Sequence, residues 1–224
     1  MNDDPQDDVD LSRFSAPKRT EPCKLYLISP QEVGGGFPDR LRAALGGGSV
    51  AAFQLRVKDV DEHALARLAE PLQAICAEHD VAFIVNDSMR LAKRLGADGV
   101  HLGQSDDDPR EARELLGPAA QIGRTCHDSR HLAMEAGEAG CDYVAFGAFY
   151  PTNTKPSHYR PDPQLLAWWS AIAEIPSVAI GGITPVNAAP LVAAGADFIA
   201  VCQAVWGGDD PTSAVADFER AFAI

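Results

Sequence analysis

The sequence lacks the features of several classes of protein. Its five cysteines are scattered and odd in number, and no two have CxxC spacing, so neither a disulfide framework nor a zinc site is indicated. No apolar run approaches the roughly 20 residues that span a bilayer. The N-terminus has neither the basic start nor the apolar core of a signal peptide. We therefore expect a cytoplasmic protein with no membrane partner.

Basic residues are also scarce. The chain has 19 Lys and Arg against 32 Asp and Glu, a formal net charge of -13. Proteins that bind nucleic acid or anionic lipid need a cationic surface, so we expect no nucleic-acid partner. With 224 residues, 46% of them hydrophobic, the chain suits one globular domain with a sizeable core.

From Lys24 onward, short apolar β-prone runs alternate with helical patterns, which is typical of βα units around a parallel sheet. The expected strands are Leu25–Ser29, Val50–Arg56, Ala82–Asn86, Gly99–Leu102, Gln121–Thr125, Tyr143–Gly147, Ser177–Gly181 and Phe198–Cys202. The expected helices are His63–His79, Ser88–Leu95, Asp108–Leu116, Arg130–Ala139, Pro163–Ile172, Pro185–Ala194 and Pro211–Ala223. Eight units predict an α/β fold, a single-domain (β/α)8 TIM barrel over residues 24–224, with residues 1–23 as a tail or strap. An open doubly wound sheet is the alternative, but the pattern does not change midway.

A short motif recurs where three helices end and even-numbered strands begin. Its copies are Gly96-Ala-Asp98, Gly140-Cys-Asp142 and Gly195-Ala-Asp197. Glycine can end a helix in the left-handed conformation, and aspartate can accept from backbone donors in the following turn. Because they lie at strand starts, away from the catalytic face of a barrel, we interpret these aspartates as structural.

Polar clusters follow the strands at the opposite end, where βα barrels carry their chemistry. Gln54, Arg56 and Lys58 alternate along the end of one strand, so their side chains share a face that would point into the barrel mouth. An Arg fork and a Lys point charge suit a pyrophosphate. The alternative is a solvated strand end with surface salt bridges.

Two carboxylates follow neighbouring strands. Asn86-Asp87 and Asp106 would lie on adjoining loops, where two carboxylates can share a hard cation such as Mg²⁺ that also bridges to substrate phosphate. The alternatives are helix capping by Asp87 and a favourable charge near a helix N-terminus for Asp106.

The late strands carry smaller groups. Thr152, Thr154 and Lys155 follow the sixth strand, and their hydroxyls and charge could hold a phosphate, although a simple turn is the alternative reading. Gly181 and Gly182 after the seventh strand, with Cys202-Gln203 after the eighth, occupy loops that commonly bind phosphate in such barrels.

Two histidines invite a catalytic reading. His101 lies within a strand, where a packed, hydrogen-bonded imidazole is expected, whereas His127 is more open.

Together these motifs resemble the thiamine phosphate synthase family from about Leu25 to the C-terminus. The shared motifs are Gln54-Leu-Arg56-Val-Lys58, Val85-Asn86-Asp87, His101 to Asp106, Pro151 to Lys155 and Ile180 to Ile183. The family is a TIM barrel that joins hydroxymethylpyrimidine diphosphate to a thiazole phosphate and releases pyrophosphate.

The resemblance implies a role for each site residue. Gln54 would bind the pyrimidine, and Mg²⁺ would be bound by Asp87 and Asp106. The diphosphate would be held by Arg56, Lys58, Asn86, Thr125 and Lys155. The thiazole phosphate would be held by Thr152, Thr154, Gly182, Cys202 and Gln203. Arg56, Lys58 and Lys155 would be the catalytic cations. The resemblance also suggests a homodimer.

The chain departs from the family pattern at several positions. Val57 replaces a usual Glu, Thr125 a usual Ser, and Gln203 a small Ser whose pocket the longer side chain could crowd. The segment after Lys155 is shorter than usual. Two other hypotheses therefore stay open: a thiazole tautomerase that uses an acid/base such as His127, and a catalytically silent ligand-sensing barrel.

Overall fold

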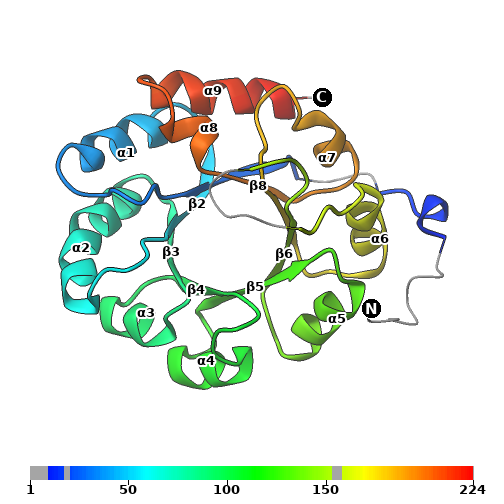
Figure 1. The fold of residues 1–224 in the computed structure, drawn as a ribbon, viewed down its shortest axis with the longest axis horizontal. Helices are drawn as coiled ribbons and strands as arrows, with labels where there is room; N and C mark the ends of the chain where they lie inside the picture. Colours follow the sequence, from blue (N-terminus) through cyan, green and yellow to red (C-terminus); the bar gives the residue numbers. More distant parts are fainter. Residues whose placement is uncertain (1–9, 18–20, 153–157, 224) are drawn as a thin grey trace.

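A computed structural model describes residues 10–17, 21–152 and 158–223. Within these residues eight parallel strands pair in sequence order, and β1 pairs with β8 to close the barrel. The strands are β1 (Lys24–Ile28), β2 (Val50–Leu55), β3 (Ala82–Asn86), β4 (Gly99–Leu102), β5 (Gln121–His127), β6 (Tyr143–Gly147), β7 (Ser177–Ile180) and β8 (Phe198–Val201). Figure 1 looks down this barrel, with helices surrounding the ring of strands. The predicted (β/α)8 barrel is confirmed, and the open sheet is wrong.

The helices follow the strands and cover them from outside. They are α1 (Phe37–Leu45), α2 (Glu62–Glu78), α3 (Met89–Leu95), α4 (Pro109–Leu116), α5 (Arg130–Glu138), α6 (Gln164–Ile172), α7 (Ala189–Ala193), α8 (Gln203–Trp206) and α9 (Pro211–Phe222). A 3-10 turn, η1 (Leu11–Arg13), precedes the barrel, and Leu11 and Phe14 pack against its core. No helix among the described residues combines the length and the apolar character needed to cross a membrane.

Strand alternation divides the apolar residues into two cores. Inside the barrel pack Tyr26, Ile28, Ala52, Ile84, Tyr143, Ala145, Val178 and Ala200. The alternate residues face the helices, where Phe53, Phe83 and Phe146 are almost fully buried with Trp169 of α6. Successive side chains point to opposite faces of a strand, so the inward positions near the carboxyl ends are the ones that line the mouth.

The three repeated aspartates each accept a hydrogen bond from a backbone N–H of the preceding strand. The pairs are Asp98 with Phe83 (2.7 Å), Asp142 with Ile122 (2.6 Å) and Asp197 with Ser177 (2.8 Å). Each carboxylate therefore ties an odd-numbered strand to the even-numbered strand that follows, at the amino-terminal end of the barrel. These contacts support the structural interpretation of the repeat.

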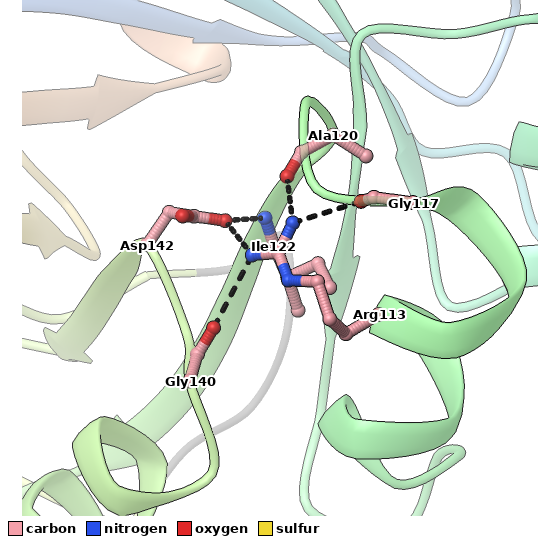
Figure 2. A network of polar contacts seen from close by, with 6 residues as sticks. All are labelled: Arg113, Gly117, Ala120, Ile122, Gly140 and Asp142. Atoms are coloured by element: carbon pink, nitrogen blue, oxygen red, sulfur yellow. Dashed lines mark hydrogen bonds and ion pairs between the residues drawn. The ribbon is translucent and has the colours of Figure 1, made fainter.

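Arg113 of α4 extends this network (Figure 2). Its guanidinium lies among acceptors from two turns, one between α4 and β5 and one between α5 and β6. It donates to the carbonyls of Gly117 (3.1 Å), Ala120 (2.6 Å) and Gly140 (3.2 Å) and to Asp142 (2.5 Å). One side chain thus connects α4 to the start of β5 and the start of β6.

Most expected elements agree with the observed bounds to within one residue, and three differences are larger. No helix was among those expected between the first two strands; α1 forms there with Pro38 in its first turn. The helix expected at Pro185–Ala194 is shorter, because Asn187 accepts from the N–H of Thr184 in a turn that precedes α7. Strand β5 runs two residues further than expected, through a register shift between Thr125 and His127.

Candidate active site at the barrel mouth

Loops after β1 and β2 hold the cationic cluster. The N–H of Arg56 donates to Ser29 Oγ (2.8 Å). Gln31 bonds the Lys58 backbone twice, accepting from its N–H (3.1 Å) and donating to its carbonyl (2.6 Å). The backbone that carries both cations is therefore anchored to the neighbouring loop, a support that the sequence reading missed.

Lys58 and Asp87 form an ion pair between the loops after β2 and β3. Asp87 has a left-handed backbone conformation (φ 66°), which is uncommon outside glycine and concentrates at functional sites. Burial raises the pKa of Asp87, but the hydrogen bond from Lys58 and the charges of Lys58 and Arg56 outweigh it, so the pKa lies below its usual value. The carboxylate is thus held ionised beside two cations.

Asp106 lies within hydrogen-bonding reach of Asp87 and accepts from the N–H of Gly103 (2.6 Å). Burial and the neighbouring Asp87 raise the pKa of Asp106, although the Gly103 N–H acts in the opposite direction. Two carboxylates held together in this way repel each other unless a proton or a cation lies between them. The described residues place no third His, Cys, Asp or Glu ligand with them.

The capping alternative for Asp87 is wrong, and Asp106 does not cap the following helix either. Ser88, not Asp87, caps α3 by accepting from the N–H of Leu91 (3.1 Å). Asp108, not Asp106, caps α4 by accepting from the N–H of Arg110 (2.7 Å). Helix capping therefore does not account for Asp87 or Asp106.

A row of polar side chains crosses the barrel interior below this pair. Gln54, only 3% exposed, donates through Nε2 to Tyr26 Oη (2.9 Å). The hydroxyls of Tyr26 and Tyr143 are 3.0 Å apart. His101 Nδ1 lies 3.1 Å from Tyr143 Oη, and its Nε2 lies 2.9 Å from Thr125 Oγ1. His101 is hydrogen-bonded inside the barrel, as expected.

The remaining predicted residue of this half, Asn86, ends β3 and pairs in register with His101. Sequence reasoning missed Tyr26 and Tyr143, which look like ordinary core aromatics. The one sequence feature that could have identified them is strand alternation, which places both side chains inside the barrel on β1 and β6.

The loops after β6 and β7 run side by side. The N–H groups of Phe149 and Tyr150 donate to the carbonyls of Ile180 (3.1 Å) and Gly181 (3.0 Å). Gly182 has a left-handed backbone (φ 65°), and a Cβ there would collide with the Pro151 carbonyl. Glycine is therefore required at this turn, which brings it beside Pro151 and the adjoining Thr152. The other predicted residues of this loop, Thr154 and Lys155, lie outside the described residues.

Cys202 and Gln203 begin the short helix α8. Cys202 Sγ donates to the Ser29 carbonyl (3.5 Å), which ties the end of β8 to the end of β1. The exposed Gln203 side chain runs along its own helix, so that its Nε2 would touch a Cβ added to Gly207. The absence of a side chain at Gly207 leaves room for this conformation.

His127, the more open histidine, also has a left-handed backbone (φ 55°). Its ring stacks on Tyr159, with centroids 4.1 Å apart and planes inclined by 20°. The contact joins the end of β5 to the loop that follows β6.

The side chains at the mouth define a class of protein. Cations, a carboxylate pair and a glycine turn converge at the carboxyl-terminal mouth of a closed (β/α)8 barrel, the arrangement of a barrel enzyme with an anion-binding site.

The chain belongs to the thiamine monophosphate synthase family, whose sequence profile matches residues 25–205. It is 65% identical over 206 residues to a thiamine-phosphate synthase of Erythrobacter litoralis, covering 90% of this chain and 97% of that one. It is 54% identical over 200 residues to one of Rhodospirillum centenum, covering 88% and 97%. The solved thiamine phosphate pyrophosphorylase from Pyrococcus furiosus has a TM-score of 0.79 and 32% identity, covering 89% of this chain and 95% of that one. The chain is an enzyme of the transferase class.

Proposed function

We propose that this enzyme joins hydroxymethylpyrimidine diphosphate to hydroxyethylthiazole phosphate to give thiamine phosphate and pyrophosphate. With the carboxylated form of the thiazole phosphate, carbon dioxide would be released as a third product. The observation that carries the proposal is the Lys58–Asp87 pair beside Asp106 at the mouth. A site for one simple phosphate needs cations alone, whereas carboxylates among the cations suit a diphosphate that arrives with a divalent metal.

Asp87 and Asp106 fit Mg²⁺. Both are oxygen donors within reach of each other, and the raised pKa of Asp106 reflects in part a like charge that a cation would neutralise. With two protein ligands, Mg²⁺ would keep positions for water and diphosphate oxygens. When bound, the metal supplies positive charge to the departing pyrophosphate.

The other residues of this half would hold and polarise the diphosphate. Arg56 and Lys58 would stabilise the negative charge that develops on the pyrophosphate as its bond to the methylene carbon breaks, together with Asn86, Thr125 and the sequence-predicted Lys155. The bonding electrons leave with the pyrophosphate, and the thiazole nitrogen supplies the pair for the new C–N bond. The electron-rich aminopyrimidine stabilises the cationic methylene, so no protein nucleophile is needed.

Gln54 would recognise the pyrimidine. With one Nε2 hydrogen given to Tyr26, its Oε1 and second Nε2 hydrogen offer an acceptor beside a donor. The exocyclic amine and ring nitrogen of an aminopyrimidine offer the complementary donor and acceptor.

The loops after β6, β7 and β8 would take the thiazole phosphate. Gly182 permits close backbone approach, while Thr152 and the sequence-predicted Thr154 would supply hydroxyl donors. Because Gln203 turns along its helix toward Gly207, the longer side chain need not crowd the space beside Cys202.

Product formation tests this proposal. Purified protein with Mg²⁺ and both substrates is expected to release pyrophosphate and thiamine phosphate in equal amounts, measured by chromatography with parallel pyrophosphate detection. Omission of either substrate, or chelation of Mg²⁺, should stop both signals. A folded protein that forms no thiamine phosphate would contradict the proposal, and conversion of the thiazole phosphate without pyrophosphate release would favour the tautomerase alternative.

Gly182→Ala is expected to raise the KM for the thiazole phosphate by about tenfold or more and to lower the stability. The left-handed conformation alone costs about 1–2 kcal/mol with a Cβ, and the collision with Pro151 adds to this cost. Steady-state kinetics and thermal unfolding measure the two effects. Gly208→Ala is the matched control, because its backbone is not left-handed and nothing lies within 4 Å of an added Cβ. An unchanged KM for Gly182→Ala would remove this turn from the thiazole phosphate site.

A further inference from the structure

The hydrogen-bonded row across the barrel interior has a definite direction. It connects Gln54, Tyr26, Tyr143, His101 and Thr125, which come from β2, β1, β6, β4 and β5. Tyr26 and Tyr143 are only 4% and 7% exposed. Burial raises the pKa of Tyr26 to about 12 and that of Tyr143 well above its usual value, so both hydroxyls keep their hydrogens at neutral pH.

Counting hydrogens assigns the direction. The Gln54 amide nitrogen can only donate, so Tyr26 Oη accepts from it. Among the described residues the only other partner of the Tyr26 hydroxyl is Tyr143. A buried hydroxyl hydrogen without an acceptor is costly, so Tyr26 donates to Tyr143, and the Tyr143 hydrogen passes on to His101 Nδ1.

The same reasoning excludes the other forms of His101. If Nδ1 carried a hydrogen, whether in the other neutral tautomer or in the protonated ring, it would donate to Tyr143. Tyr143 would then have to donate to Tyr26, and the Tyr26 hydrogen would be left without an acceptor. Only the neutral ring with hydrogen on Nε2 gives each of the buried Tyr26 and Tyr143 hydroxyls an acceptor, and that Nε2 hydrogen is directed at Thr125 Oγ1.

We propose that this hydrogen-bonded row fixes His101 as the Nε2–H tautomer. The Thr125 hydroxyl hydrogen is thereby turned toward an anion at the mouth. Thr125 accepts from His101, so its own hydrogen is available as a donor. His101, Tyr143 and Tyr26 are positioning residues that connect the side chain proposed to bind the pyrimidine with one proposed to bind the diphosphate. The assignment of the pyrimidine to Gln54 and of the diphosphate to Thr125 rests on the proposed function.

Packing of the neighbouring residues holds the hydrogen-bonded row in this geometry. A Cβ added to Gly123, which pairs in register with both His101 and Tyr143, would collide with the Tyr143 ring. The missing side chain lets Tyr143 cross β5 and stack on the His101 ring, with centroids 5.6 Å apart and planes inclined by 23°. The two rings are thus fixed relative to each other before any ligand binds.

Nitrogen NMR tests the tautomer directly. In protein labelled with ¹⁵N-histidine, His101 is expected to show a protonated Nε2 and an unprotonated Nδ1 at neutral pH, with its signals identified by their loss in His101→Gln. A hydrogen on Nδ1, a doubly protonated ring or a mixture of tautomers would overturn the proposal. The measurement needs no substrate, so it decides the point even if thiamine phosphate is never formed.

Pyrophosphate binding tests the consequence at Thr125. With inorganic pyrophosphate and Mg²⁺ as the probe in calorimetry, Thr125→Val is expected to weaken binding about tenfold or more, because a hydrogen bond to a charged group is lost. Tyr143→Phe removes the hydroxyl that fixes the His101 tautomer, so the Thr125 hydrogen faces the mouth in only a fraction of the molecules. Affinity falls with that fraction, and we expect about threefold weaker pyrophosphate binding. In the Thr125→Val background Tyr143→Phe should have almost no further effect.

A matched control separates this effect from general damage. Tyr150→Phe removes another tyrosine hydroxyl near the mouth, one that donates to the Asn187 carbonyl (2.8 Å), and should leave pyrophosphate affinity unchanged. Equal weakening by Tyr143→Phe in the parent and in the Thr125→Val background, or no weakening in either, would overturn the proposed coupling. Pyrophosphate binding with this pattern but without thiamine phosphate formation would contradict the proposed function alone.

Discussion

Asp87→Asn is expected to lower kcat for thiamine phosphate formation by about a hundredfold or more while leaving the melting temperature close to the parent's. The substitution removes the carboxylate that pairs with Lys58 and faces Asp106, and with it half of the proposed Mg²⁺ site. Losing one electrostatic contact to developing charge costs about 10²–10³ in rate. Asparagine tolerates the left-handed backbone at this position better than alanine does, so the change isolates charge from conformation.

Steady-state kinetics over a range of Mg²⁺ concentrations measure the effect. The concentration for half-maximal rate should rise in Asp87→Asn, because one metal ligand loses its charge. Asp80→Asn is the matched control: Asp80 is exposed, has the same left-handed conformation (φ 56°), and lies between α2 and the start of β3, at the opposite end of the barrel. Loss of folding in Asp87→Asn would show that Asp87 has a structural role instead. An unchanged kcat and Mg²⁺ dependence would remove Asp87 from the proposed metal site.

Arg113→Met is expected to lower the free energy of unfolding by about 2–3 kcal/mol without changing kcat. The guanidinium donates to four acceptors at the amino-terminal end of the barrel (Figure 2), and its side chain is 27% exposed. Removing a charged partner leaves partly buried acceptors unpaired, which costs about 1–3 kcal/mol or more. Methionine keeps most of the apolar stem, so the loss reports on hydrogen bonds and charge.

Urea unfolding followed by circular dichroism measures this loss as a shift of the midpoint. Arg220→Met is the control, because the Arg220–Asp217 pair is more exposed, 68% and 46%, and lies within one helix. Exposed pairs of this kind contribute about 0–1 kcal/mol. A similar midpoint shift in the two variants would mean that the Arg113 network adds little beyond an ordinary surface ion pair.

The sequence was informative about the elements and less so about their ends. Three strands, β3, β4 and β6, have the predicted bounds, because their apolar runs are short and are bounded by turn residues. The missed helix α1 shows the limit of this reasoning: it is a nine-residue helix between glycine-rich turns, with Pro38 in its first turn. Local composition does not show how a segment packs, and α1 is stabilised by burying Leu41 and Ala44.

Capping shows the same limit at single-residue resolution. Asp87 and Ser88 are both good capping residues, and their order along the chain does not say which one turns toward the helix. In the folded chain Ser88 caps α3, and Asp87 is left to face Lys58 on the neighbouring loop. Asp87 is therefore placed by a contact across 29 residues of sequence, and its role as a metal ligand stays a prediction.

The amino-acid sequence alone determined the barrel, the order of its strands and the polar clusters at their ends, because periodicity and turn residues are local properties. It also carried the family resemblance, and the Mg²⁺ and homodimer expectations stay predictions. Only the tertiary structure decided which side chains meet: Lys58 with Asp87, and Gln54 through Tyr26, Tyr143 and His101 with Thr125. These partners come from different strands, and their contact depends on how the closed barrel staggers one strand against the next. That stagger is set by the packing of the whole interior and cannot be read from any one segment.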